Sequence, residues 1–394
     1  MRSAREAIDE LRASAQRCVG VKRVPLVKAG GRVLAKPIVS ELDVPPADNS
    51  AMDGYALRFD EWPGKTAPMP VSQRITAGSA PAPLEPGTAA RIFTGAEIPD
   101  GADTVVIQEH TQASEEAVLL TRLPDRCANI RPQGQDIARG REVVHPGCRL
   151  RPQELGLLAS IGIERVPVFE RLRVAIVSTG DELREPGEQL APGQIYNSNR
   201  YLLRGLLESW GFKVVDLGIA KDTPDAIAAV FEAAAERAHV VLSTGGVSVG
   251  EEDHVRAVIE RLGALALWKI AMKPGKPLAF GRIGETPFIG LPGNPSSALV
   301  TALVVARPFL FDCQGRSDVS WRPLEIPAAF SKRGGPREEF LRVRRADGRL
   351  ERYPNQSSGV LLSASWGDGL AVQAPGRDIE AGDVVPFLAY ADLL

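Results

Sequence analysis

The sequence is poor in the residues that mark several classes of protein. Only four of 394 residues are Cys, only four are His, and aromatic residues make up 6%. The cysteines show no C-x-x-C spacing, so the sequence predicts neither a zinc site nor a dense disulfide framework and favours a reduced, cytoplasmic protein. The longest apolar run, 298–306, is about half of the roughly 20 residues that span a bilayer, which predicts no membrane span.

The sequence also lacks an excess of positive or negative charge. Lys and Arg total 47 against 49 Asp and Glu, a formal net charge of -2. This balance argues against nucleic-acid or membrane binding driven by total charge, but it leaves room for a basic pocket that takes a small anion. The composition is that of an ordinary globular protein, and at about 150 residues per domain the length predicts two to four domains.

Short apolar strands alternate with helical segments between residues 166 and 320. Strands are expected at 173–178, 212–217 and 240–243, with helices at 198–210 and 223–238. This alternation predicts a doubly wound, mostly parallel α/β domain, within a multidomain α/β plus β protein. The flanking sequence predicts three further units, a discontinuous helical or mixed domain (1–44 plus 141–165), an inserted β domain (45–140) and a C-terminal β domain (321–394).

The strongest chemical signal is a glycine-rich segment, residues 243–253, which follows a buried strand and is called here the Gly loop. Gly245, Gly246, Ser248 and Gly250 give backbone N–H groups close access to a phosphate. The spacing matches neither a P-loop nor a G-x-G-x-x-G fingerprint. An ordinary turn between strand and helix explains the loop equally well.

Lysines and carboxylates gather at other strand ends. Lys269, Lys273 and Lys276 surround a proline-bracketed turn and could bind an oxyanion, although a solvated turn is the simpler interpretation. Ligands of a doubly wound sheet bind at the carboxyl ends of its strands, where this turn and the Gly loop both map. Carboxylates at the same edge favour a Mg²⁺ site, whereas each one singly suits a helix N-terminus.

Two groups of loop residues complete the candidates. Pro292, Asn294 and Pro295 form a rigid turn before the last long helix and could line a pocket. Asp53 lies in an irregular segment of small polar residues, and residues 93–96 and 131–136 are similar in composition. Each of these segments is also explained by the ordinary preference of such residues for turns.

Seven motifs in one order resemble the molybdopterin molybdenumtransferase family, which includes bacterial MoeA and the gephyrin E domain. They are DNSAMDGYA, TGAEIPDGADTVV, STGDEL, the Gly loop, KPGKP, LPGNP and SSGVLLS. The resemblance covers residues 1 to about 390 and implies four domains, with a C-terminal β-barrel-like domain. It also implies an elongated homodimer, with the site between the α/β domain of one subunit and the β domain of the other.

The resemblance implies insertion of molybdate into adenylylated molybdopterin, with Mg²⁺ assistance and release of AMP and molybdenum cofactor. The catalytic residues it implies are Asp53, Thr94, Asp136, Glu182, Asp222 and Asp253, of which Glu182, Asp222 and Asp253 would hold the metal. The substrate-binding residues it implies are Gly245, Gly246, Ser248, Gly250, Lys269, Lys273, Lys276, Pro292, Asn294 and Pro295.

Two alternatives remain open at this point. A molybdopterin adenylyltransferase would use a similar Gly loop, but it leaves the motifs near residues 48–56 and 94–106 unexplained. A scaffold protein that contacts other molybdenum cofactor biosynthesis proteins could use the basic segment 331–352. There Leu341 and Val343 alternate with Arg342 and Arg344 before an Asp347-Gly348 turn, which predicts a hairpin with solvated faces.

Overall fold

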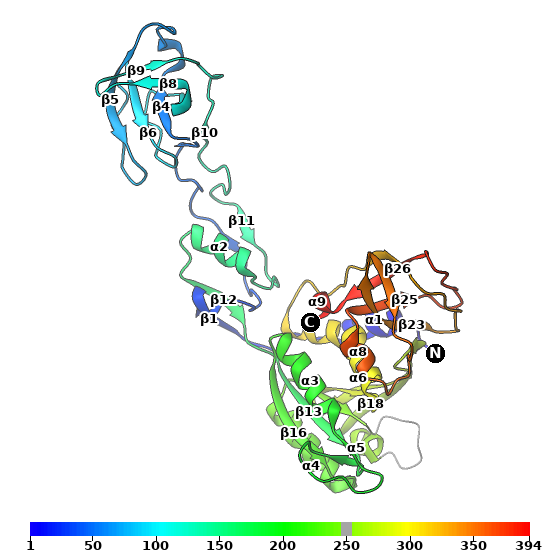
Figure 1. Cartoon of the computed structure of the whole chain (residues 1–394). Helices are drawn as coiled ribbons and strands as arrows, with labels where there is room; N and C mark the ends of the chain where they lie inside the picture. Colours follow the sequence, from blue (N-terminus) through cyan, green and yellow to red (C-terminus); the bar gives the residue numbers. More distant parts are fainter. Residues whose placement is uncertain (246–253) are drawn as a thin grey trace.

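The computed structural model describes residues 1–245 and 254–394. Figure 1 shows an elongated molecule with a β domain at one end and the α/β and C-terminal domains at the other. A narrow mixed segment built around α2 (Pro152–Ser160) and the β1–β12 pair (Val21–Pro25 and Arg165–Phe169) joins the two ends. The predicted multidomain α/β plus β fold is confirmed.

The α/β domain is built on a six-stranded sheet of order β16-β13-β17-β21-β20-β18. Its first four strands are parallel, and β20 runs antiparallel to β21 and β18. The strands are β13 (Arg173–Thr179), β16 (Lys213–Ala220), β17 (Val240–Thr244), β18 (Gly263–Lys269), β20 (Pro277–Ile283) and β21 (Thr286–Leu291). The predicted strands are therefore present, with a mixed edge beyond β21.

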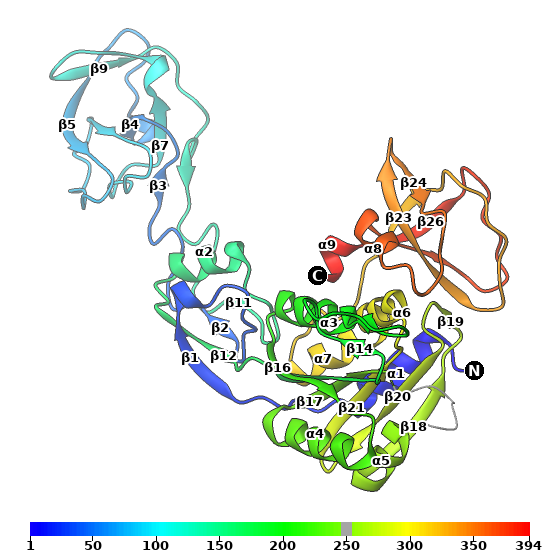
Figure 2. The ribbon, with the colours of Figure 1, turned by 60° about the horizontal axis from the view of Figure 1, so that its bottom comes forward.

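Helices cover both faces of this sheet because successive side chains of a buried strand point to opposite sides. Val174 and Ile176 of β13 join the core under α3 (Ser198–Ser209). Ala175 and Val177 pack on the other face against α4 (Pro224–Arg237) and α5 (His254–Leu262). Figure 2 shows the sheet between these two helical layers. A near-continuous apolar strand thus anchors a three-layer domain.

One long helix spans Pro295–Gln314 and forms the centre of the larger core. It consists of α6 (Pro295–Thr301), a π-helical segment η4 (Ala302–Ala306) and α7 (Arg307–Gln314). Pro308 does not end the helix, because it lies in the first turn of α7, directly after the π turn. The helix is long and apolar enough to cross a membrane, yet 94% of its most apolar window is buried in the protein. It is a core helix.

The N-terminal helix α1 (Ala4–Ser14) begins at a capping box formed by Ser3 and Glu6. Its buried residues Ala7 and Leu11 join the core of the α/β domain. Residues 4–14 therefore pack on that domain, whereas the sequence grouped them with residues 21–44 and 141–165. The mixed segment itself contains β1, β12, α2 and the pair β2 (Ile38–Val39) with β11 (Glu142–Val144).

The inserted β domain has the strand order β7-β4-β6-β5-β9-β8. Its strands are β4 (Gly54–Leu57), β5 (Met69–Ile75), β6 (Ala89–Ile92), β7 (Thr104–Ile107), β8 (Thr111–Ala113) and β9 (Ala117–Leu120). The short pair β3 (Asn49–Ser50) and β10 (Ile130–Arg131) leads into it, with 3-10 turns η2 (Phe59–Glu61) and η3 (Gln108–His110). Apolar residues such as Leu57 and Val106 fill its interior.

The C-terminal domain is a sheet of order β19-β23-β25-β26-β22, to which β24 adds on β23. The elements are β19 (Met272–Lys273), β22 (Leu324–Pro327), β23 (Glu338–Ala346), β24 (Arg349–Arg352), α8 (Leu362–Trp366), β25 (Gly369–Gln373), β26 (Val384–Ala389) and α9 (Tyr390–Leu393). Because β19 comes from the α/β domain, the sheet itself ties the two domains together.

The hairpin predicted in this domain is present, but one of its faces is not solvated. β23 pairs with β24 across a turn in which Asp347 and Gly348 have positive φ angles of 48° and 74°. Arg344 is exposed, whereas Arg342 is only 1% exposed. The prediction of solvated faces is wrong for Arg342, because the chain folds back over it.

Candidate active site

A cavity of about 1020 Å³ lies where the α/β and C-terminal domains meet. It opens at the carboxyl ends of β13, β17 and β21. Thr179 is the last residue of β13, Gly245 directly follows β17 and Pro292 directly follows β21, and all three line the cavity. This is the edge at which parallel α/β sheets bind ligands. Its volume is at the upper end of the range of about 300–1,000 Å³ typical of small-molecule sites.

Close backbone packing shapes the floor of the cavity. Gly245 has a φ of 88°, and a Cβ atom there would stand 2.5 Å from the carbonyl oxygen of Thr179. Gly293 lies beside it, since a Cβ atom at Gly293 would be in ordinary van der Waals contact with the Gly245 Cα at 3.8 Å. The remaining predicted residues of the Gly loop (Gly246, Ser248 and Gly250) lie outside the described residues.

The predicted rigid turn lies on the cavity wall. Pro292, Asn294 and Pro295 all line it, and Pro295 is the first residue of α6. The side chain of Asn199 donates a 2.6 Å hydrogen bond to the carbonyl of Gly293 and so joins α3 to this turn. The N-termini of α3 and α6 consequently border the same space, which favours an anionic ligand.

Two of the three predicted lysines reach the cavity. Lys273, the last residue of β19, and Lys276, in the turn before β20, line it, and the peptide bond before Pro274 is cis. The Lys273 Nζ lies 3.4 Å from Glu339, whose side chain is only 6% exposed. Within residues 1–245 and 254–394, no ion pair engages Lys276. Its ammonium group is therefore the lysine charge most available to an anion.

Lys269 lies elsewhere. It is exposed at the end of β18, where it borders a second hollow with Arg2, Glu6 and Trp268. Its carbonyl accepts a hydrogen bond from the backbone N–H of Arg2. The structure does not bring Lys269 to the main cavity.

The C-terminal domain supplies one whole side of the cavity. Arg337 and the segment 356–359 line it. Ser296 at the start of α6 holds this segment, since its N–H donates to Ser358 O and its hydroxyl donates to Val360 O. Buried Arg342 supports the segment from behind by donating to Ser357 O at 3.1 Å. Among the described residues that line the cavity, Lys273, Lys276 and Arg337 outnumber Glu182, so this part of the lining is cationic.

The predicted metal-binding carboxylates are only partly assembled. Glu182 lines the cavity, and its carboxylate packs over the backbone of Gly180. Asp222 follows β16, and its N–H donates to Asp181 Oδ1 at 3.4 Å, so the two turns adjoin. Asp253 lies outside the described residues. Across the part of the chain that the structure describes, no three His, Cys, Asp or Glu side chains group as metal ligands.

The remaining predicted residues belong to the far end of the molecule. Asp53 precedes β4, and its Oδ1 accepts hydrogen bonds from the N–H and the hydroxyl of Thr94 at 2.8 and 2.7 Å. These bonds, first the one from the backbone N–H, hold the pKa of Asp53 below its usual value and keep it ionised. Asp136 lies between β10 and β11. Figure 1 shows β4 and β10 at the end of the molecule away from the α/β domain and β11 in the connecting segment, and none of the three residues lines the cavity.

Comparisons with known proteins agree with the motifs. Family models match residues 2–162 (MoeA N-terminal region, domains I and II), 175–312 (probable molybdopterin binding domain) and 327–390 (MoeA C-terminal region, domain IV). A molybdopterin molybdenumtransferase of Haemophilus influenzae is 43% identical over 74% of this chain and 72% of that protein. One from Nostoc is 37% identical over 90% of this chain and 85% of that protein.

A solved structure has the same fold along the whole chain. The molybdopterin biosynthesis MoeA protein of Pyrococcus horikoshii is 30% identical, with a TM-score of 0.81 and coverage of 98% of both chains. The chain belongs to the molybdopterin molybdenumtransferase family. The resemblance is confirmed. The adenylyltransferase alternative is not favoured, because the family models extend over the N-terminal and C-terminal domains as well, and the scaffold alternative is not favoured, because the curated relatives are named as transferases.

The cavity lining also shows what the sequence reasoning missed. Arg337 and residues 356–359 line the cavity but were not among the predicted site residues. Ser357, Ser358 and Gly359 stand in the SSGVLLS motif, which could have drawn attention to them. Thr179 and Asn197 also line it, and within the described ranges the Thr179 hydroxyl and the Asn197 amide nitrogen have no hydrogen-bond partner. No sequence signal marks Arg337.

Replacing Gly245 by Ala tests the close packing at the floor of this family member's cavity. The new Cβ would meet the Thr179 carbonyl in a backbone conformation that disfavours side chains, so we expect a destabilisation of about 1–3 kcal/mol. The floor would also shift, and molybdenumtransferase activity should fall about tenfold for a loss of roughly 1.4 kcal/mol. Gly382→Ala is the control, because its φ is 103° but nothing lies within 4 Å. Equal losses in both variants would contradict a specific role for the packing.

Proposed function

We propose that this chain inserts molybdate into adenylylated molybdopterin and releases AMP and the molybdenum cofactor. The observation that carries this proposal is a cationic, nucleotide-sized cavity bordered by two helix N-termini and two lysines. The related proteins of Haemophilus influenzae and Nostoc are named molybdopterin molybdenumtransferases. Molybdate and a phosphoanhydride repel each other, so a site that joins them must neutralise charge.

The residues of the chain divide this work in the proposal. Lys273, Lys276 and the helix N-termini would hold the phosphates and molybdate as fixed positive groups that need no reorganisation. Gly245, with the rest of the Gly loop, would let backbone N–H groups approach the pterin phosphate. Pro292, Asn294 and Pro295 would keep the opposite wall rigid, and Lys269 would act only on ligand parts outside the main cavity.

A Mg²⁺ ion is part of the proposal. Its ligands would be Glu182, Asp222 and Asp253, an all-oxygen set that suits Mg²⁺, which is usually held by one or two carboxylates together with substrate phosphates. The adjoining turns of Asp181 and Asp222 fit such a shared site. When bound, the ion would withdraw negative charge from the phosphoanhydride.

We further propose that the working form is a homodimer in the cytoplasm. Asp53, Thr94 and Asp136 belong to the far end of the chain, so a second subunit would have to bring its β domain to the cavity. The ionised Asp53 still has Oδ2 free of the bonds to Thr94, and this oxygen could face the substrate. Contact with other molybdenum cofactor biosynthesis proteins remains a prediction.

The test of the proposed function measures AMP release from adenylylated molybdopterin with molybdate and Mg²⁺, beside ATP consumption with free molybdopterin. We expect AMP release and no ATP consumption, and the opposite result would overturn the proposal. Asp222→Ala should fold normally and lose Mg²⁺-dependent AMP release by about 100-fold or more. Asp225→Ala, three residues further on at an exposed position, is the matched control. Full activity of Asp222→Ala would remove the metal site from the proposal.

A further inference from the structure

One wall of the cavity is a segment outside the main sheet. Residues 181–197 leave β13 and return at the start of α3, and their only strands are the short pair β14 (Leu183–Arg184) and β15 (Ile195–Tyr196). This segment, called here the wall segment, supplies Glu182, Leu183, Ile195 and Tyr196 to the cavity. Ile195 and Tyr196 are 55% and 45% exposed. The wall segment therefore has little core of its own and needs another means of attachment.

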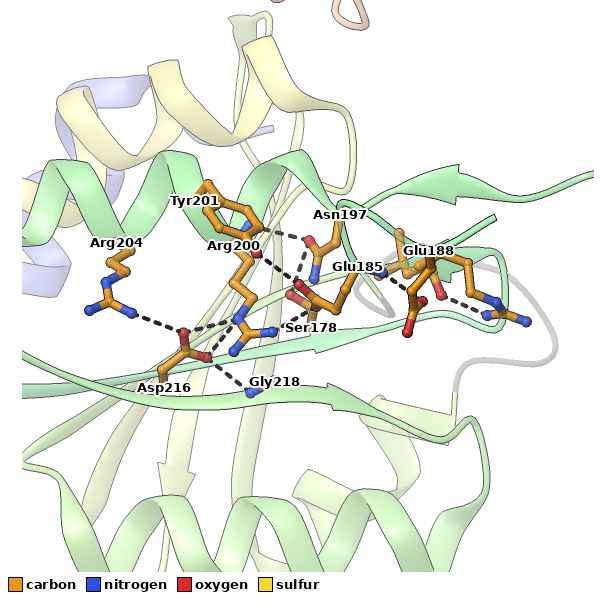
Figure 3. Close-up of polar contacts among 11 residues, drawn as sticks. Ser178, Glu185, Glu188, Asn197, Arg200, Tyr201, Arg204, Asp216 and Gly218 are labelled. Atoms are coloured by element: carbon orange, nitrogen blue, oxygen red, sulfur yellow. Dashed lines mark hydrogen bonds and ion pairs between the residues drawn. The ribbon is translucent and has the colours of Figure 1, made fainter. Parts of the chain in front are cut away.

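That attachment is an ion pair with α3. The Arg200 Nη1 lies 2.7 Å from Oε1 of Glu185, and the hydroxyl of Tyr201 donates to Oε2 of the same carboxylate at 3.1 Å. Figure 3 shows Arg200 and Tyr201 reaching from the helix to Glu185. Glu185 stands three residues after Glu182, which lines the cavity. The contacts from α3 to Glu185 therefore hold the wall segment close to Glu182.

The Arg200 guanidinium is itself held from the sheet. Its Nε lies 2.9 Å from both carboxylate oxygens of Asp216 on β16, and Asp216 also accepts from the N–H of Gly218. The side chains of Arg200, Glu185 and Asp216 are 25%, 27% and 17% exposed, so solvent screens this network less than it screens a surface pair. Without the guanidinium, Glu185 and Asp216 would both lose an ion-pair partner.

We propose that Arg200 is a positioning residue for the proposed reaction, which it serves by joining β16 to the wall segment through Asp216 and Glu185. It does not line the cavity. Its role is to keep the wall segment in the binding-competent arrangement before substrate arrives. If the wall segment is in the binding-competent arrangement for only a fraction of the time, the apparent affinity of the protein for substrate falls in proportion to that fraction. The inference about KM rests on the proposed function, whereas the inference about the wall segment does not.

The experiment compares Arg200→Met with Arg204→Met in the full-length protein. Arg204 is the matched control because it lies one helical turn further on, contacts the same Asp216 at 3.7 Å and does not contact Glu185. The first readout is hydrogen exchange of two amides in the wall segment, Ile195 N–H and Asn197 N–H, which donate to Glu182 O and Arg184 O. We expect at least tenfold faster exchange in Arg200→Met and no change in Arg204→Met.

The second readout is steady-state AMP release. Arg200→Met should raise KM for adenylylated molybdopterin about tenfold and change kcat less than threefold, because saturating substrate restores the arrangement. Arg200→Lys, which keeps the charge but not the two-sided guanidinium, should fall between wild type and Arg200→Met. Unchanged exchange and KM in Arg200→Met, or equal changes in Arg204→Met, would overturn the inference. A wild-type protein that releases no AMP would refute the proposed function alone, since the exchange result would still stand.

Discussion

Replacing Lys276 by Met is expected to lower kcat/KM for AMP release about 100-fold while leaving the thermal stability of the protein unchanged. Lys276 is exposed in the cavity, and within the described part of the chain no carboxylate pairs with it. A charge-assisted contact to an anionic substrate is worth about 1.5–3 kcal/mol, which corresponds to a factor of roughly 10 to 150. The measurement is steady-state kinetics at varied molybdate concentrations.

Lys273→Met provides the internal comparison. Its ammonium group is shared with buried Glu339, which also lies 3.0 Å from Lys332, so part of its charge is already neutralised. We expect a higher molybdate requirement but a smaller loss, about tenfold. Lys213→Met, at the exposed start of β16 and thus at the opposite edge of the sheet, should have no effect. An unchanged molybdate dependence in both cavity variants would refute the anion-binding role of the turn.

Replacing Phe311 by Ala is expected to be the most destabilising of these changes. Phe311 is fully buried in α7, and its ring meets Trp210 and Phe212 edge-on at centroid distances of 5.7 and 5.9 Å. Two guanidinium groups, from Arg307 and Arg316, also stack on it. Removing a buried phenylalanine costs about 3–5 kcal/mol, through lost burial and the cavity that remains.

The measurement is thermal unfolding followed by near-ultraviolet circular dichroism, which reports on packed aromatic rings. For a domain of this size the loss corresponds to a decrease in Tm of about 10 °C. Leu362→Ala, at a position that is 66% exposed, should leave Tm unchanged and serves as the control. A shift below about 2 °C in Phe311→Ala would show that the aromatic cluster is not central to the domain.

Local patterns in the sequence predicted elements whose cause is local. The helix over Ser198–Ser209 follows from apolar residues at helical spacing, and Asn197 caps it by accepting from the N–H of Arg200. Thr223 and Pro224 start α4 as their chemistry requires. The alternation of short apolar strands, such as β13, with helical segments predicted the α/β domain and the edge where its ligands bind.

Such local patterns could not predict which side chains are covered by distant segments of the chain. The alternation around Arg342 indicated a solvated strand face, yet the segment 356–363 covers that side chain and takes up its hydrogen bonds. Arg337 and Ser358 reach the cavity because β19 of the α/β domain pairs with β23 of the C-terminal domain and Ser296 of α6 bonds to Ser358. Helix α1 likewise packs on the core of the α/β domain, although the residues that follow it in the sequence belong to the mixed segment.

The sequence by itself determined the family, the α/β domain and the strand ends where its chemistry gathers, because these depend on short-range patterns and ordered motifs. The tertiary structure alone decided which charged residues share the cavity. It brought Lys273 and Lys276 to the wall of the cavity and left Lys269 at a separate hollow. It also placed Asp53 and Thr94 in the β domain at the opposite end of the molecule. Side-chain proximity across domains depends on how folded surfaces pack, which no local pattern of residues encodes.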